Sequence, residues 1–325
     1  MKKTLLFALC ALVILSGSVF AAGQKEAAYP RKAIDLIVPA SAGSGGDVLT
    51  RIFAKYLALE LNVAVNVNNQ GGGNGIPAVQ AMLKANPDGH TLLADQALAS
   101  AYQLLLPNLP YQVDDRSYIA RIGKGPQVLC IGPNSPWQDL NDVAKFAKES
   151  PEKFIWGGIS ASSAADLVQL QFMKAAGVDV TKTKKLAYTG GGEILSAIAG
   201  GHILFGTSAA SGVPPFSQSG KVKPLVISGS SRLGALPGVK SAAEQGFPAV
   251  DIGFWVGFSG QKDLPKEVVD TLNSAIQRFI KRADFLQDID RVGVVLSYAG
   301  PEQMKKDVHE EAAAVKALQL YGAGK

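Results

Sequence analysis

Short loops rich in glycine and hydroxyl residues carry the side chains and backbone groups that could hold a ligand. The first lies between Val38 and Asp47, after the strand-like run Ile34–Val38 and before a helix-like run over about 48–61. Glycine lets successive backbone N–H groups point at one spot, and a helix N-terminus adds a partial positive charge. The loop therefore predicts an anion site that needs no charged side chain.

Two further loops follow the same pattern later in the chain. Ser160–Ser163 follows a strand-like run over 154–157, and Tyr188–Glu193 follows a short one over 186–187. Each loop precedes a helix-like run. Loops at the carboxyl ends of strands gather along one edge of an open α/β sheet. Two lobes that face each other would place all three loops around one cleft, as a clamp for a small anion that closes by hinge motion.

Side chains in these loops divide into ligand contacts and structural caps. Hydroxyl groups can donate hydrogen bonds to a carboxylate, and the best candidates are Ser41, Ser44, Ser160, Ser162 and Thr189. Acids in the first turn of a helix are favoured by capping and by the macrodipole. For the acids Asp47, Asp166 and Glu193 we expect these structural roles rather than ligand contact.

No catalytic, cofactor or metal motif accompanies the loops. Gly220-Lys221 is followed by Val222, which rules out a P-loop, and Val48 stands where a dinucleotide loop needs its last glycine. The G-x-S-x-G nucleophile elbow is absent as well. The three histidines lie far apart and share no metal-ligand spacing. We expect Cys130, in an apolar strand, to be a buried small hydrophobe. We therefore expect no enzyme, no cofactor and no metal site.

Charge and the N-terminus indicate export. The 325 residues carry a formal net charge of +5, and removal of Lys2 and Lys3 leaves +3, scattered too thinly to predict nucleic-acid binding. Residues 1–22 have a basic start, the short apolar run Leu5–Leu15 and small residues up to Ala22. This pattern is typical of a cleavable signal peptide. We expect a periplasmic protein with Cys130 as its single cysteine.

The remaining chain alternates strand-like and helix-like runs, which predicts an α/β fold with two lobes. We place domain 1 at residues 29–126 plus 246–325 and domain 2 at residues 127–245. Separate strands are expected at 118–122 and 128–131. Pro214-Pro215 should break any helix between the strands on either side, and Lys182–Lys185 reads as a solvated surface loop.

Taken together, these motifs resemble the substrate-binding receptors of tripartite tricarboxylate transporters, the Bug-type periplasmic proteins. The resemblance covers nearly all of the chain after residue 28. The blocks that carry it include Tyr29-Pro30, Ile37-Val38-Pro39 and the loop to Asp47, Gly71–Gly75, Asn86–Leu93, Leu109-Pro110-Tyr111, Gly157–Asp166, Tyr188–Glu193, Gly200-Gly201-His202, Ser219–Leu225 and Leu236–Val239.

The resemblance implies a two-domain periplasmic-binding-protein fold with a ligand cleft between the domains. It implies a carboxylate held by the loop before the first helix and by the loop near Tyr188, partly through ordered waters. It also implies a partner permease with a large and a small membrane subunit. The binding roles carried over fall on Ser41, Ala42, Gly43, Ser44, Gly45, Gln96, Ser160, Ala161, Ser162, Tyr188, Thr189, Gly190, Gly191, Gly192 and Ser208.

One departure from the family pattern bears on specificity. The family's first loop often reads Pro-Phe-Ala-Pro-Gly-Gly, whereas this chain reads Pro39-Ala40-Ser41-Ala42-Gly43-Ser44. We expect the pocket to differ there. The leading hypothesis is a monomeric receptor for a small di- or tricarboxylate. Two alternatives stay open: an exported α/β enzyme acting on an anionic substrate, and a receptor that feeds a membrane sensor.

Overall fold

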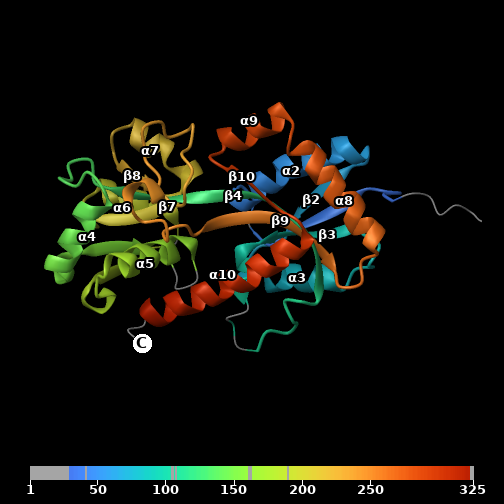
Figure 1. Ribbon diagram of the computed structural model, residues 1–325, viewed down its shortest axis with the longest axis horizontal. Coiled ribbons are helices and arrows are strands. Elements are labelled where there is room, and N and C mark those ends of the chain that lie inside the picture. The colour runs from blue at the N-terminus through green and yellow to red at the C-terminus, as the bar shows by residue number, and fades with distance from the viewer. Residues whose placement is uncertain are drawn as a thin grey trace, which may run out of the picture.

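A computed structural model describes residues 29–322, apart from residues 41, 104, 105, 107, 160–162 and 189 (Figure 1). The expected signal peptide, Ser41, Ser160–Ser162 and Thr189 therefore lie outside the described residues.

Strands and helices alternate along the chain. The strands are β1 (Ile34–Val38), β2 (Val65–Asn69), β3 (Thr91–Gln96), β4 (Arg116–Ile131), β5 (Ile155–Gly158), β6 (Lys184–Ala187), β7 (Phe205–Ala209), β8 (Lys223–Ile227), β9 (Gly253–Gln261) and β10 (Val295–Ala299). The helices are α2 (Gly45–Leu61), α3 (Ile76–Leu83), α4 (Leu140–Glu149), α5 (Ala164–Ala176), α6 (Gly191–Ala199), α7 (Pro214–Gln218), α8 (Lys266–Phe279), α9 (Ala283–Arg291) and α10 (Pro301–Gly322).

All ten strands join in one continuous sheet, whose main path runs β2-β1-β3-β9-β4-β7-β5-β6. Strands β1, β2 and β3 are parallel to one another, and so are β5, β6 and β7. The long strand β4 joins the two sets. Its residues 116–126 pair with β9, and its residues 127–131 pair with β7 and β8. The sheet therefore has two halves that share β4.

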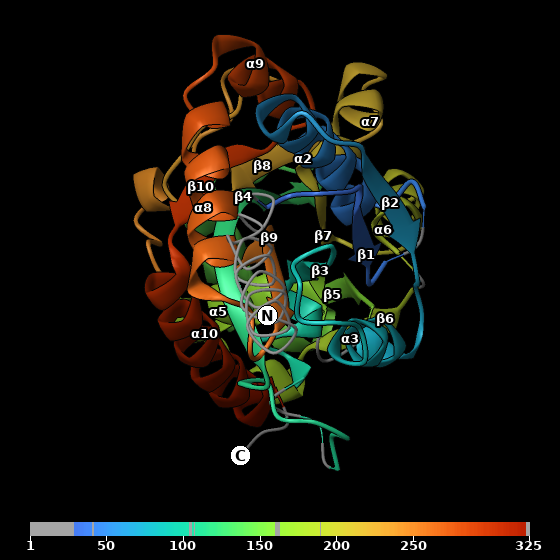
Figure 2. The ribbon, with the colours of Figure 1, turned by 90° about the vertical axis from the view of Figure 1, so that its right-hand side faces the viewer.

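Each half has its own aromatic core, and we call the halves lobe 1 and lobe 2. In lobe 1, Phe53 of α2 packs with Phe279 of α8 and Phe285 of α9. In lobe 2, Phe205 of β7 packs with Phe154 and with Phe172 of α5. Figures 1 and 2 show α2 and α9 on one side of the sheet and α3 and α10 on the other. Helix α10 packs against both β4 and α5, so it spans the two lobes.

Several local expectations were wrong in instructive ways. The two strands expected at 118–122 and 128–131 are one strand, because Gly123 and Gly125 continue the pairing with β9 across register shifts. Pro214-Pro215 does not break a helix but begins α7, where the first turn needs no N–H donors. Residues Lys184 and Lys185 belong to strand β6 rather than to a surface loop. The domain boundaries at 126/127 and 245/246 stay a prediction.

A partly buried acid, Glu311, links α10 to strand β9 and to the turn that contains Tyr102. The Nε1–H group of Trp255 donates to Glu311 Oε2 at 2.7 Å, and the Tyr102 hydroxyl donates to Glu311 Oε1 at 3.4 Å. Burial raises the pKa of Glu311, although these hydrogen bonds and the charges of Lys124 and Arg121 oppose the shift. The fold therefore favours the neutral acid at this position.

This preference predicts a pH-dependent gain in stability for Glu311→Gln. The contribution of Glu311 is present below the pKa of an unfolded glutamate, about 4.3, and is lost as the pH rises through the higher folded pKa. The glutamine variant keeps an oxygen acceptor for Trp255 and carries no charge. We expect its free energy of unfolding in urea, relative to that of the unmodified protein, to increase between pH 4 and pH 8.

Three other acids, Asp251, Asp307 and Glu310, line the same region beside Glu311. The neighbouring Glu310 is exposed and supplies the matched control. Glu310→Gln removes an exposed negative charge from the same helix. An equal pH dependence in both variants would contradict the assignment to Glu311.

Candidate ligand-binding site

The first turn of α2 contains backbone donors for which the helix itself supplies no acceptor. The helix begins at Gly45, three residues earlier than the sequence predicted, and Ser44 is its N-cap. The Ser44 hydroxyl accepts a hydrogen bond from the N–H of Asp47 at 3.3 Å. The N–H groups of Gly45 and Gly46 have no carbonyl one turn earlier to pair with. They lie at the positive end of the helix dipole, where an anion is stabilised.

Asp47 folds back to hold the loop in front of this turn. Its buried carboxylate accepts from the Gly43 N–H at 2.8 Å, from Asn69 Nδ2 at 2.9 Å and from Arg51 Nε at 3.1 Å. Burial alone would raise the pKa of Asp47, but these three donors outweigh it and hold the pKa below its usual range. Asp47 thus has the first-turn position expected of it. The two loop residues Ala42 and Gly43 are exposed to solvent, although the Gly43 N–H donates to Asp47.

The two glycines of the first turn are required by their neighbours. A Cβ atom at Gly46 would lie 2.5 Å from Gln96 Nε2, and a Cβ atom at Gly45 would lie 3.3 Å from Cζ of Phe254. The amide of Gln96 and the ring of Phe254 therefore pack directly on the helix backbone. Of the predicted residues in lobe 1, the structure brings Ser44, Gly45 and Gln96 together around one helix terminus.

Lobe 2 repeats this construction at α5. Ser163 is the N-cap, and its hydroxyl accepts from the N–H of Asp166 at 3.1 Å. The buried Asp166 carboxylate accepts from the Ile159 N–H at 2.6 Å, from the Ser163 hydroxyl at 2.8 Å and from the ammonium of Lys185. Asp166 thus binds the described residues Ile159 and Ser163, as Asp47 binds Gly43. Both loops share the pattern Ser-x-x-Asp.

The third loop lies against the end of β7. Gly190 is the N-cap of α6, and Gly191 opens the helix so close to Ser208 that a Cβ atom would lie 2.5 Å from the hydroxyl oxygen. The Tyr188 N–H donates to the carbonyl of Gly158 at 2.8 Å, which joins this loop to the end of β5. The structure therefore brings Tyr188, Gly190, Gly191 and Ser208 together. Gly192 and Glu193 follow them in the exposed first turn of α6.

Strand pairing relates the two sets of residues. Gln96 pairs with Val256 of β9, which pairs with Gly123 of β4. Ser208 of β7 pairs with Val128 of the same strand. Val128 lies five residue steps after Gly123 along the strand, which is about 17 Å. The carboxyl ends of the parallel strands of both lobes therefore approach one segment of β4.

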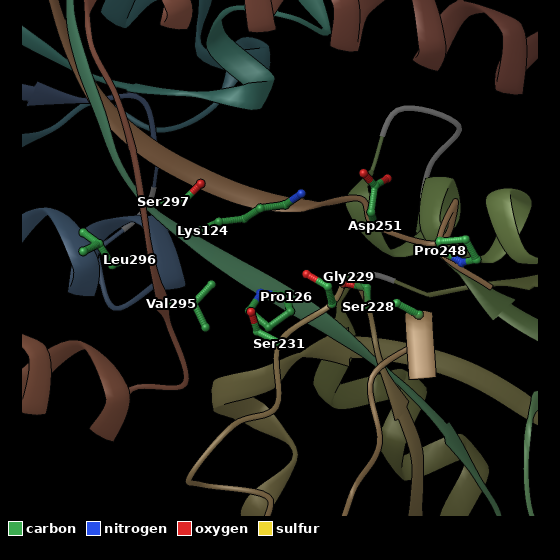
Figure 3. Close-up of a pocket in the computed structure, with 12 residues that line it drawn as sticks. Lys124, Pro126, Ser228, Gly229, Ser231, Pro248, Asp251, Val295, Leu296 and Ser297 are labelled. Atoms are coloured by element: carbon green, nitrogen blue, oxygen red, sulfur yellow. The ribbon is translucent and has the colours of Figure 1, made fainter. Parts of the chain in front are cut away.

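A cavity of about 310 Å³ adjoins the same segment of β4 at Lys124 and Pro126 (Figure 3). Its lining includes Lys124 of β4, Asp251, and Val295 and Leu296 of β10. In Figure 3 the Lys124 side chain extends across the top of the cavity toward Asp251. Among the described residues, none of those predicted for ligand binding lines this cavity.

Three further features bear on enzyme and membrane functions: the thiol of Cys130, groups of metal-ligating side chains, and helices that could cross a membrane. Cys130 is fully buried and burial raises the pKa of its thiol, as expected of a small core residue. Within residues 29–322, outside the gaps, no group of three His, Cys, Asp or Glu side chains could hold a metal ion. No helix in the described part of the chain is both long and apolar enough to cross a membrane.

Comparison with known proteins identifies the family. The model of the tripartite tricarboxylate transporter family receptor, TctC, matches residues 49–320. The chain belongs to this family of solute receptors. BugT of Bordetella pertussis is 26% identical over 314 residues, which cover 96% of this chain and 95% of BugT.

Solved structures show the same two-domain receptor fold. MatC from Rhodopseudomonas palustris with bound malate has a TM-score of 0.71 at 24% identity, and the match covers 90% of this chain and 100% of MatC. A second R. palustris protein, solved with adipate, has a TM-score of 0.76 at 21% identity over 91% of this chain and 98% of its own. The family expected from the motifs is confirmed, and so is the fold class.

Three side chains at the site were missed or misread in the sequence. Lys185, expected from the sequence to lie in a solvated loop, pairs with Asp166. Its Nζ atom lies 5.5 Å from the ring centre of Trp156. Arg51 lies one helical turn after Asp47, a spacing that could have suggested the ion pair. Phe254 had no such signal, because its contact with Gly45 joins segments about two hundred residues apart.

The pairing of Lys185 with a buried acid predicts a loss of stability for Lys185→Met. Asp166 is 1% exposed and Lys185 is 34% exposed, so the substitution leaves a buried carboxylate without its cation. We expect the free energy of unfolding to fall by about 1–3 kcal/mol, measured by urea denaturation at pH 7. Lys184→Met is the matched control, since the adjacent side chain of an edge strand points to the opposite face. Equal effects of the two substitutions would show that the pair contributes nothing.

Proposed function

We propose that this protein is a periplasmic receptor that binds a small di- or tricarboxylate between its two lobes and delivers it to a tripartite tricarboxylate transporter permease. The observation that carries the proposal is the repeated helix terminus. Ser44 and Asp47 in lobe 1, and Ser163 and Asp166 in lobe 2, hold first turns whose remaining N–H groups have no intrahelical partner. Such groups favour a carboxylate over a neutral ligand.

The strand pairing supports a site shared by the lobes. Both sets of loops approach the segment of β4 between Gly123 and Val128. A ligand that contacts both sets would draw the lobes together by bending at the crossover, which is how hinge closure around a ligand works. The malate and adipate in the two R. palustris structures are carboxylates of the proposed class.

Gly190 offers a direct test of the carboxylate site. Its φ is −172°, an extended value that any residue adopts, and a Cβ atom there meets nothing within 4 Å. Asp and Asn cap a helix about equally well, so Gly190→Asp and Gly190→Asn should be equally stable. Only the aspartate places a negative charge where the ligand carboxylate would bind.

We therefore expect Gly190→Asp to weaken dicarboxylate affinity by about ten-fold or more relative to Gly190→Asn, since like charges in one site repel. Isothermal titration calorimetry with malate and adipate measures the two affinities, and the melting temperature reports the fold. The site assignment is wrong if both folded variants bind with the same affinity.

The two alternatives make different predictions for the same samples. A receptor raises its melting temperature with ligand and returns the ligand unchanged. Turnover of the bound carboxylate, followed by proton NMR, would instead support an exported enzyme. Ligand uptake by cells that hold the permease genes should require this protein. If uptake were independent of it while binding persisted, the sensor alternative would be favoured.

A further inference from the structure

Phe254 lies beside the proposed carboxylate position in lobe 1. It is the one residue of β9 that is not buried, and it pairs with Gly125 of β4. A Cβ atom at Gly125 would overlap the ring, and a Cβ atom at Gly45 would touch it at 3.3 Å. Two glycines therefore make room for a phenyl ring against the first turn of α2, and Phe254 as a residue is only partly buried.

The two charged side chains in the first two turns of α2, Asp47 and Arg51, pair with each other. Arg51 donates to Asp47 and to Asn69, so it is engaged in holding the loop. The positions around the first turn then offer two chemistries: the N–H groups of Gly45 and Gly46, which have no intrahelical acceptor, and the apolar ring of Phe254. A carboxylate would bind the N–H groups, and the carbon next to that carboxylate would lie near the ring.

An aromatic ring stabilises methylene groups through apolar contact but accepts no strong hydrogen bond from a hydroxyl group. A hydroxyl group buried against it loses its water without replacement, which costs free energy. We propose that Phe254 selects dicarboxylates with unsubstituted methylene chains, such as succinate and adipate, over hydroxylated ones such as tartrate. This inference rests on the proposed function and names the substrate class of that site.

Succinate and meso- or L-tartrate form the probe pair, because both inner carbons of tartrate carry a hydroxyl group. No orientation of tartrate can then keep a hydroxyl away from the ring. Calorimetric titration of the full chain should show succinate binding about ten-fold or more tightly than tartrate. Phe254→Gln replaces the ring with an amide that can pair with a hydroxyl, and it should reduce this ratio at least several-fold.

Phe254→Leu is the matched control, because it keeps an apolar surface and should retain the preference for succinate. If Phe254→Gln does not fold, Phe254→Tyr adds one hydroxyl to an otherwise unchanged ring and should shift the ratio in the same direction.

Tartrate binding equal to or tighter than succinate in the unmodified protein would overturn the inference and leave the proposed function standing. The same holds for a ratio that Gln or Tyr leaves unchanged. Failure of every dicarboxylate to bind would overturn both.

Discussion

The first turn of α2 is the constraint on which the lobe 1 site depends. Each of its positions has a physical requirement. Ser44 caps the N–H of Asp47, Gly45 admits Phe254, Gly46 admits Gln96, and the Asp47 carboxylate reaches back to the Gly43 N–H. Arg51 and Asn69 keep that carboxylate charged although it is buried. The negative charge of Asp47 is thus balanced by Arg51 within the protein. The partial positive charge of the helix N-terminus can then still stabilise an anion.

Lobe 2 also contains a buried carboxylate at the start of a helix, and a different cation balances its charge. Asp166 binds Ile159 and Ser163 as Asp47 binds Gly43, but its charge is balanced by Lys185 from the neighbouring strand rather than by a residue one turn along the helix. Because β4 belongs to both halves of the sheet, the two termini are connected through the pairing of one strand. Small bends at the crossover would change their separation without disturbing either loop.

Much of this could be predicted from the sequence, because the signals were local. Glycine and hydroxyl residues between a strand and a helix predicted the loops, and the position of Asp47 and Asp166 at the start of helix-like runs placed them in first turns. The helix start at Gly45 was missed because two glycines read as loop. Lys185 and Phe254 could not be found from spacing, since their partners are distant in sequence and meet only through strand pairing.

The central claim is that unpaired N–H groups in the first turns of these helices bind the ligand carboxylates. Amide proton shifts in a ¹⁵N-labelled sample, titrated with succinate or adipate, test it most directly. The claim predicts that the Gly45 and Gly46 amide protons move downfield together and saturate at one ligand per chain, while the Gly43 amide, already bonded to Asp47, moves little. Saturating ligand that leaves Gly45 and Gly46 unshifted would contradict it.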